Sequence, residues 1–265
     1  MMFTFIIHLL LAYFAVEPTL SSSNMAVYYQ LVYVDDTLSM ESPKTEFMVL
    51  LVGEQQSLFK SYNKYLQDSL IQAHSSSGTT PKEFFELKKQ YPNSNFDFQI
   101  VKNTRSIKVY DKIIPDHYVY EKDMSGLEWE ITGDKKTLMG FTVQKAKALY
   151  GGRVWEAWFS EDLPLNDGPY VFGGLPGLVI EVKDSQGHYA FNLYKIKKGI
   201  KSSLEPYLVK KPIVASEKQF LRLRKEFHLQ ASQKLSQSNM EVRDIELARQ
   251  VDERFRRKSN FIEVN

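Results

Sequence analysis

Residues 141–159 read FTVQKAKALYGGRVWEAWF, and this stretch carries the clearest folding signal in the chain. Two strand-like runs flank Gly151 and Gly152, and a two-residue primed turn needs such a pair because both central residues take positive φ. In the resulting hairpin, small residues lie opposite large ones on one face, and oppositely charged residues lie opposite each other on the other face. Its expected pairs are Tyr150 with Arg153, Ala148 with Trp155, Ala146 with Ala157, Lys147 with Glu156, and Lys145 with Trp158.

Alternating apolar residues continue the strand pattern outward from this hairpin in both directions. Such runs occur at 25–34, 46–61, 96–100, 107–109, 118–120 and 178–193. Apolar residues at helical spacing occur at 62–72, at 81–90 and over about 216–258. Strands first and helices last predict an α+β fold, with a mostly antiparallel sheet, helices packed on one side and a helical C-terminal tail.

The C-terminal tail has two capping-box patterns, Ser216 with Gln219 and Ser238 with Glu241. Its last helix ends in four cations, which are Arg254, Arg256, Arg257 and Lys258. Cations stabilise the C-terminus of a helix, so a solvated helix end explains them better than an anionic-ligand site does.

Composition narrows the function classes. The chain has 265 residues, a formal net charge of +2 and no Cys. So small a charge disfavours a nucleic-acid partner. Without Cys there is no disulfide, no thiolate metal site and no lipoprotein anchor. The length fits one domain, for which we take residues 24–265.

The N-terminus resembles an export signal. Residues 3–16 are almost all apolar but too few to span a membrane. Ser21 and Ser23 then stand where a cleavage site before Asn24 needs small residues. We therefore expect residues 1–23 to be a signal peptide and the mature protein to be exported, with no transmembrane span.

The familiar catalytic motifs are absent from the sequence. Gly173, Gly174 and Gly177 have the wrong spacing for a nucleotide loop and precede a strand rather than a helix. The five His show no metal-ligand spacing, and no Gly-x-Ser-x-Gly occurs. We therefore predict no metal and no cofactor. The acidic residues Glu161, Asp162 and Asp167, together with His188, leave a hydrolase as an alternative.

Aromatic residues gather around a glycine- and proline-rich segment. Trp155 and Trp158 precede it, and Tyr170 and Phe172 lie within it. These rings either line an apolar ligand pocket or form the core seam between two hairpins, and both interpretations stay open. The candidate binding residues are Trp155, Trp158, Tyr170, Phe172, Gly174, Leu175, Pro176, Gly177 and Leu178.

The same segment resembles the signature of the GLPGLI family, exported proteins of unknown function found mainly in Bacteroidota. The likeness runs from Gly151 to Val179 and includes the closing residues 260–264, NFIEV. Family members are often encoded near TonB-dependent outer-membrane receptors, and no catalytic residue is carried over from the family. By analogy of shape we expect a curved sheet, a half-barrel like that of the lipoprotein carrier LolA, closed by helices.

These features together predict a periplasmic or outer-membrane-associated protein of the cell envelope that is more plausibly a binding or accessory module than an enzyme. It would hold a peptide, a lipid or a segment of an envelope protein partner. The alternatives are a peptidase-like envelope hydrolase and a purely structural or assembly protein.

Overall fold

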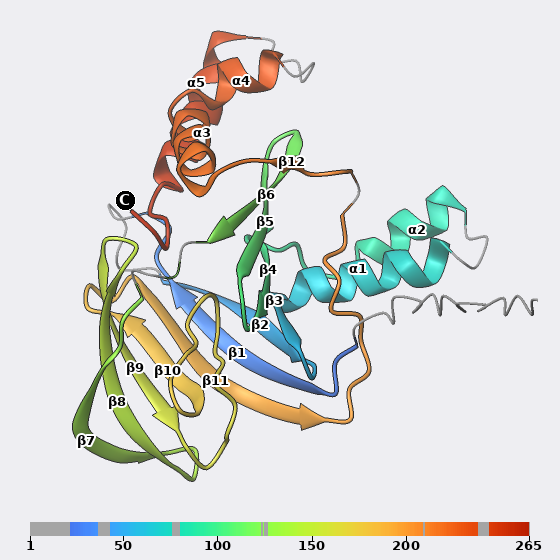
Figure 1. Cartoon of the computed structure of the whole chain (residues 1–265). Helices are drawn as coiled ribbons and strands as arrows, with labels where there is room; N and C mark the ends of the chain where they lie inside the picture. The colour runs from blue at the N-terminus through green and yellow to red at the C-terminus, as the bar shows by residue number, and fades with distance from the viewer. Residues whose placement is uncertain are drawn as a thin grey trace, which may run out of the picture.

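The computed structural model describes residues 22–36, 43–75, 80–122, 124, 127–208, 210–237 and 244–264. Within these residues twelve strands form one sheet in the order β12-β6-β5-β4-β3-β2-β1-β11-β10-β9-β8-β7 (Figure 1). The strands are β1 Met25–Tyr33, β2 Lys44–Val52, β3 Gln56–Ser61, β4 Gln99–Asn103, β5 Ile107–Ile113, β6 Asp116–Lys122, β7 Glu130–Leu138, β8 Phe141–Tyr150, β9 Arg153–Ser160, β10 Leu178–Asp184, β11 Tyr189–Lys198 and β12 Ile213–Val214.

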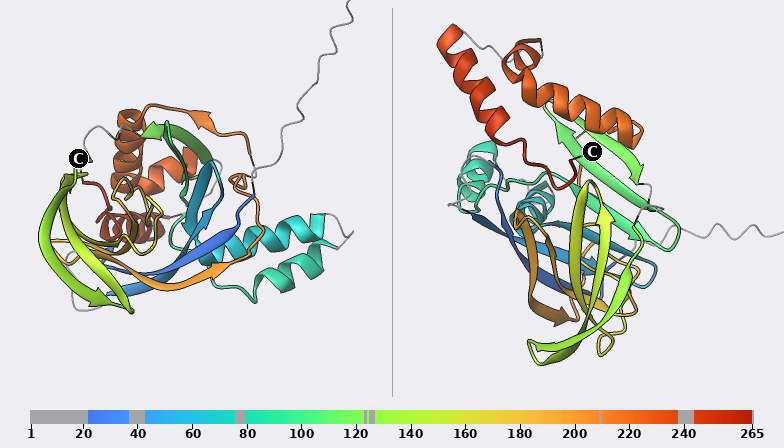
Figure 2. Two further views of the ribbon diagram at one scale, coloured as in Figure 1. Left: turned by 60° about the horizontal axis from the view of Figure 1, so that its bottom comes forward. Right: turned by 90° about the vertical axis from the view of Figure 1, so that its left-hand side faces the viewer.

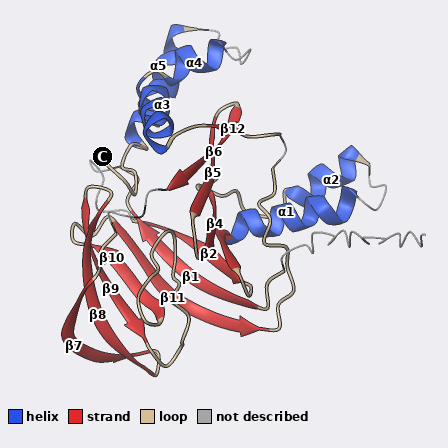
Figure 3. Cartoon of the chain, in the orientation of Figure 1, coloured by secondary structure: helices blue, strands red, loops and turns tan. Residues whose placement is uncertain are grey.

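Every strand pair is antiparallel except the short contact between β12 and β6. Strand β1 pairs with β2 on one side and with β11 on the other, so it joins the two halves of the sheet. The helices among the described residues are α1 Tyr62–Ser75, α2 Pro81–Lys88, α3 Glu217–Leu229, α4 Ala231–Gln237 and α5 Ile245–Arg257. The α+β class with a curved, open, mostly antiparallel sheet is thus confirmed (Figure 3).

The hairpin of β8 and β9 has the predicted register at all five pairs. Gly151 and Gly152 take φ of 58° and 76°, as the primed turn requires. On the outer face of this hairpin, Glu156 lies 3.1 Å from Lys145 and 3.6 Å from Lys147. Local pairing and turn chemistry therefore decide this part of the fold.

The sheet is bent into a bowl (Figure 2). Its two faces carry different cores. The main core fills the concave face and includes Phe220 and Phe227 of α3. A smaller core on the other face includes Val49 and Leu58, with Tyr62 of α1 packed against it. The helices therefore cover both faces of the sheet. The sequence prediction of helices packed on one side describes the C-terminal helices.

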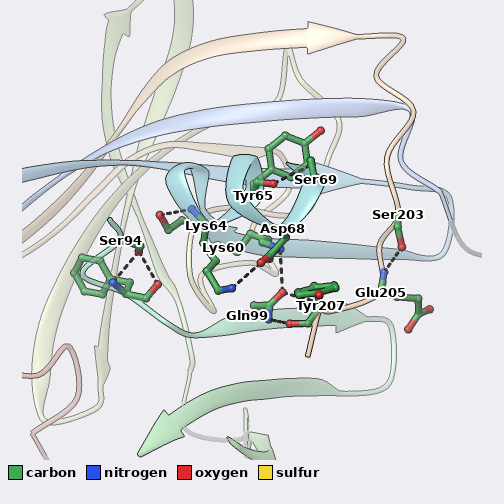
Figure 4. Close-up of polar contacts among 12 residues, drawn as sticks. Lys60, Lys64, Tyr65, Asp68, Ser69, Ser94, Gln99, Ser203, Glu205 and Tyr207 are labelled. Carbon is green, nitrogen blue, oxygen red and sulfur yellow. Dashed lines mark hydrogen bonds and ion pairs between the residues drawn. The ribbon is translucent and has the colours of Figure 1, made fainter. Parts of the chain in front are cut away.

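Buried charged side chains hold helix α1 against the sheet (Figure 4). The Lys60 ammonium donates to Asp68 at 2.6 Å and to the Gln99 carbonyl oxygen at 3.0 Å. Gln99 in turn binds the backbone of Tyr207 through both its amide atoms, at 2.8 and 3.1 Å. Burial lowers the pKa of Lys60, and Asp68 opposes that shift. Since these groups all have partners, the network fixes the packing of α1.

Two sequence predictions fall on residues that the structure does not describe. Residues 1–21, most of the expected signal peptide, lie outside the described ranges, as do Ser238 and Glu241 of the second capping box. The first capping box, Ser216 with Gln219, is confirmed, and α5 begins after Asp244. No helix within the described ranges is long and apolar enough to cross a membrane.

Candidate ligand pocket

The loop between β9 and β10, residues 161–177, carries the glycine- and proline-rich segment and crosses the concave face of the bowl. Its Phe172 ring contacts Trp155 at 4.5 Å and Phe191 at 6.4 Å between ring centroids. Gly177 permits this crossing, because a Cβ there would lie 2.1 Å from the Ser160 carbonyl oxygen. The loop therefore fills the bowl as part of the core.

The sequence-predicted binding residues fall mostly inside this core. Trp155 and Phe172 are fully buried, and Tyr170, Leu175, Gly177 and Leu178 are buried as well. Gly174 and Pro176 are exposed at the loop tip. Trp158 points to the other face of β9, where the Lys136 ammonium lies 4.0 Å from its ring. The structure thus favours the core seam over the ligand pocket for these rings.

The two segments that resemble the GLPGLI family, residues 151–179 and 260–264, meet in one buried polar cluster around Arg153. The Arg153 guanidinium donates to Asp184 at 2.8 Å, to the Ile262 carbonyl at 3.0 Å and to Asn260 at 2.6 Å. Glu263 accepts hydrogen bonds from Tyr170 and Lys122. The closing residues 260–264 are therefore locked against the β8–β9 turn, which gives this cluster a structural role.

A cleft of about 860 Å³ opens beside Gly173 and Gly174. At its floor Ser57 Oγ donates to Asp167 at 2.5 Å, and Lys102 pairs with the other oxygen of the same carboxylate. Burial lowers the pKa of Lys102, and Asp167 opposes this. Ser57 also pairs across the strands with Lys102, which donates to the Gly168 carbonyl at 2.6 Å as well. The cluster therefore ties the loop to the sheet.

The residues of the hydrolase alternative do not come together. Glu161 and Asp162 follow the end of β9, whereas His188 contacts Arg153 at the start of the same strand, 3.0 Å away. The eight residues of β9 span more than about 20 Å, so these carboxylates and the imidazole cannot share one substrate atom.

A different hollow lies between the concave face and the C-terminal helices, and we call it the aromatic pocket. It has a volume of about 420 Å³, in the range of small-molecule sites. Rings from strands, helices and the chain end line it, namely those of Tyr33, Phe98, Tyr120, Phe227, Phe255 and Phe261.

Three polar side chains of this pocket occupy positions where the sequence pattern calls for apolar ones. Tyr33 follows Leu31 on the buried face of β1, and Asp111 stands between Val109 and Ile113 on that of β5. Arg224 lies one turn after Phe220 on α3. Sequence reasoning missed all three, although a charged residue on an apolar stripe is a readable signal.

The polar atoms of the pocket are poorly satisfied by protein partners. Tyr33 is 2% exposed, yet its hydroxyl has no hydrogen-bond partner among the described residues, and neither does the buried Arg224 Nε. Burial raises the pKa of Asp111 to about 6, against the attraction of Arg224. Since buried polar atoms are nearly always paired, these groups indicate a binding site.

Together the bowl-shaped sheet and this pocket define an α+β domain with one candidate binding site. The family model for the N-terminal domain described as "N-glycanase peptide" matches residues 54–218, more than half of the sequence. The chain therefore belongs to this family.

One solved structure agrees on the fold. The structure of PNGF-II in space group P21 is 13% identical, with a TM-score of 0.52, and the match covers 77% of this chain but 33% of that one. The structure in space group C2 is 12% identical with a TM-score of 0.48, covering 77% and 32%. The chain thus spans about a third of the PNGF-II chain. No curated protein matches the sequence.

Proposed function

We propose that this chain is a non-enzymatic binding module that recognises carbohydrate in the aromatic pocket. The family's description as an N-glycanase domain supports a glycan-related role. The observation that carries the proposal is the buried Tyr33 hydroxyl, unpaired within the described residues and surrounded by rings. Sugars have apolar ring faces and hydroxyl edges, which suit aromatic walls with a few fixed polar groups.

Calorimetric titration with N-glycans released from a glycoprotein tests this role. We expect saturable binding, and we expect Tyr33→Phe to weaken it by roughly 3- to 10-fold, because one hydrogen bond is lost. Tyr28→Phe is the matched control, since Tyr28 packs against Tyr62 of α1 on the opposite face. Absence of binding, or equal loss in both variants, would favour a purely structural or assembly role instead.

The cellular setting remains part of the proposal. The apolar N-terminus and the resemblance to the GLPGLI family support an exported cell-envelope protein, in the periplasm or at the outer membrane, with an envelope partner linked to TonB-dependent transport. Fractionation of cells expressing the full chain, with N-terminal sequencing of the product, tests this. A chain that keeps Met1 and stays in the cytoplasm contradicts it.

A further inference from the structure

The Arg224 guanidinium lies over two aromatic rings. Its guanidinium carbon lies 4.2 Å from the centre of the Phe261 ring and 5.6 Å from that of Phe220. Among the described residues no carboxylate lies within ion-pair distance of it, and its buried Nε has no hydrogen-bond partner. A guanidinium fixed by stacking keeps its donors available at little entropic cost.

The basic end of α5 rims the same pocket. Arg254 and Lys258 line its mouth, and Arg257 joins them in an adjoining shallow hollow. Asp35 also lies at the mouth, but Lys44 neutralises it at 2.6 Å. Asp36 and Glu253 also line the shallow hollow, so its lining holds four cations and three carboxylates, and this excess of cations favours anionic groups at the opening.

We propose that the aromatic pocket takes a sugar that bears a carboxylate, with the carboxylate against the Arg224 guanidinium and the sugar ring against the aromatic walls. This inference rests on the proposed carbohydrate-binding function and names its ligand class. Carboxylate is the group that the planar guanidinium binds best, through two parallel hydrogen bonds.

Asp111 gives the proposed complex a pH dependence. Its carboxyl on β5 faces Arg224 on α3, with Asp97 before β4 and Glu263 at the chain end adding negative charge. The neighbouring Lys112 backbone N–H donates to it at 2.7 Å. An acidic ligand is repelled by the ionised form, so its affinity rises as the pH falls through about 6.

One biantennary N-glycan, compared with and without its terminal sialic acids, tests the inference on the full chain. We expect the sialylated form to bind about 10- to 100-fold more tightly, since a charge-assisted hydrogen bond is worth about 1.5–3 kcal/mol. Arg224→Gln should abolish this preference and leave the affinity for the desialylated form nearly unchanged. Arg222→Gln is the control, because Arg222 is on the same helix, exposed, and faces Glu226.

The outcomes separate the two proposals. Equal binding of both glycans by the parent chain overturns the acidic-ligand inference and leaves carbohydrate binding in place. Binding of neither glycan overturns carbohydrate binding itself. If Arg224→Gln does not fold, Arg224→Lys and the pH profile of the parent chain decide, and an affinity for the sialylated glycan that does not rise between pH 7 and pH 5 contradicts the inference.

Discussion

Arg153 and Arg224 are two arginines of the molecular interior with opposite surroundings. The described contacts of Arg153 include Asp184, Asn260 and two backbone carbonyls. Arg224 contacts aromatic rings and has no described hydrogen bond or ion pair except a long-range attraction to Asp111. A buried cation with all its donors used holds the fold together, whereas one with free donors is available to a ligand.

The same contrast supports a structural role for the glycine- and proline-rich loop, although its sequence first suggested a binding site. Its buried polar groups hold the loop and the chain end, as the hydrogen bond from Tyr170 to Glu263 shows. The aromatic pocket is assembled from ordinary-looking segments and has unsatisfied groups instead. The following variants test this division.

Arg153→Met should have the largest effect on stability. It leaves Asp184 buried without its cation, and breaking a buried pair costs about 3–5 kcal/mol. Urea unfolding measures the change in the free energy of unfolding. Arg249→Met removes an exposed arginine that pairs with Glu246 and Glu253, and should change stability far less. Similar losses in both would contradict a structural role for Arg153.

Gly177→Ala should have the next largest effect on stability. The new Cβ meets backbone atoms of Ser160, and overpacking of this kind costs about 1–3 kcal/mol. Thermal and urea unfolding both report it. Gly133→Ala is the matched control, because a Cβ there has nothing within 4 Å, and it should leave stability unchanged or slightly raised. An unaffected Gly177→Ala would mean that the loop crosses the bowl less closely.

Tyr170→Phe and Tyr33→Phe remove the same atom in the two regions. Tyr170 donates to the Glu263 carboxylate, so its variant should lose about 1.5–3 kcal/mol. The Tyr33 hydroxyl has no described partner, so its variant should change by less than about 0.5 kcal/mol or gain stability. Equilibrium unfolding of both variants under the same conditions measures the two changes in stability. A larger loss in Tyr33→Phe than in Tyr170→Phe would contradict the proposed difference between the two regions.

Asp111→Asn should have a small effect on stability that depends on pH. Burial raises the folded-state pKa to about 6, above its unfolded value of about 4, so the folded state binds more protons between these pH values. The parent's free energy of unfolding therefore falls as the pH rises through this window.

The free energy of unfolding of Asp111→Asn should not show this decrease with rising pH. The variant should be more stable than the parent at pH 7, on the order of 1 kcal/mol because Asp111 is partly exposed, and equal to it near pH 4. Unfolding curves at pH 4, 5, 6 and 7 measure this. A difference that is the same at every pH would show that Asp111 titrates normally.

Local sequence patterns determined much of the fold. The β8–β9 register follows from Gly151, Gly152 and the facing pairs, and the start of α3 follows from Ser216 and Gln219. These features need only neighbouring residues, because turn geometry and cap hydrogen bonds are made within a few positions. The α+β class followed from the order of such elements alone.

The sites needed the tertiary structure. Composition drew attention to the aromatic rings near Phe172, and only the closure of the bowl over them decided that they are core. The aromatic pocket joins Tyr33 of β1, Asp111 of β5 and Arg224 of α3, segments far apart in the chain. Which buried polar groups find partners depends on long-range packing, so the sequence determined the elements and the tertiary structure alone decided where the candidate pocket forms.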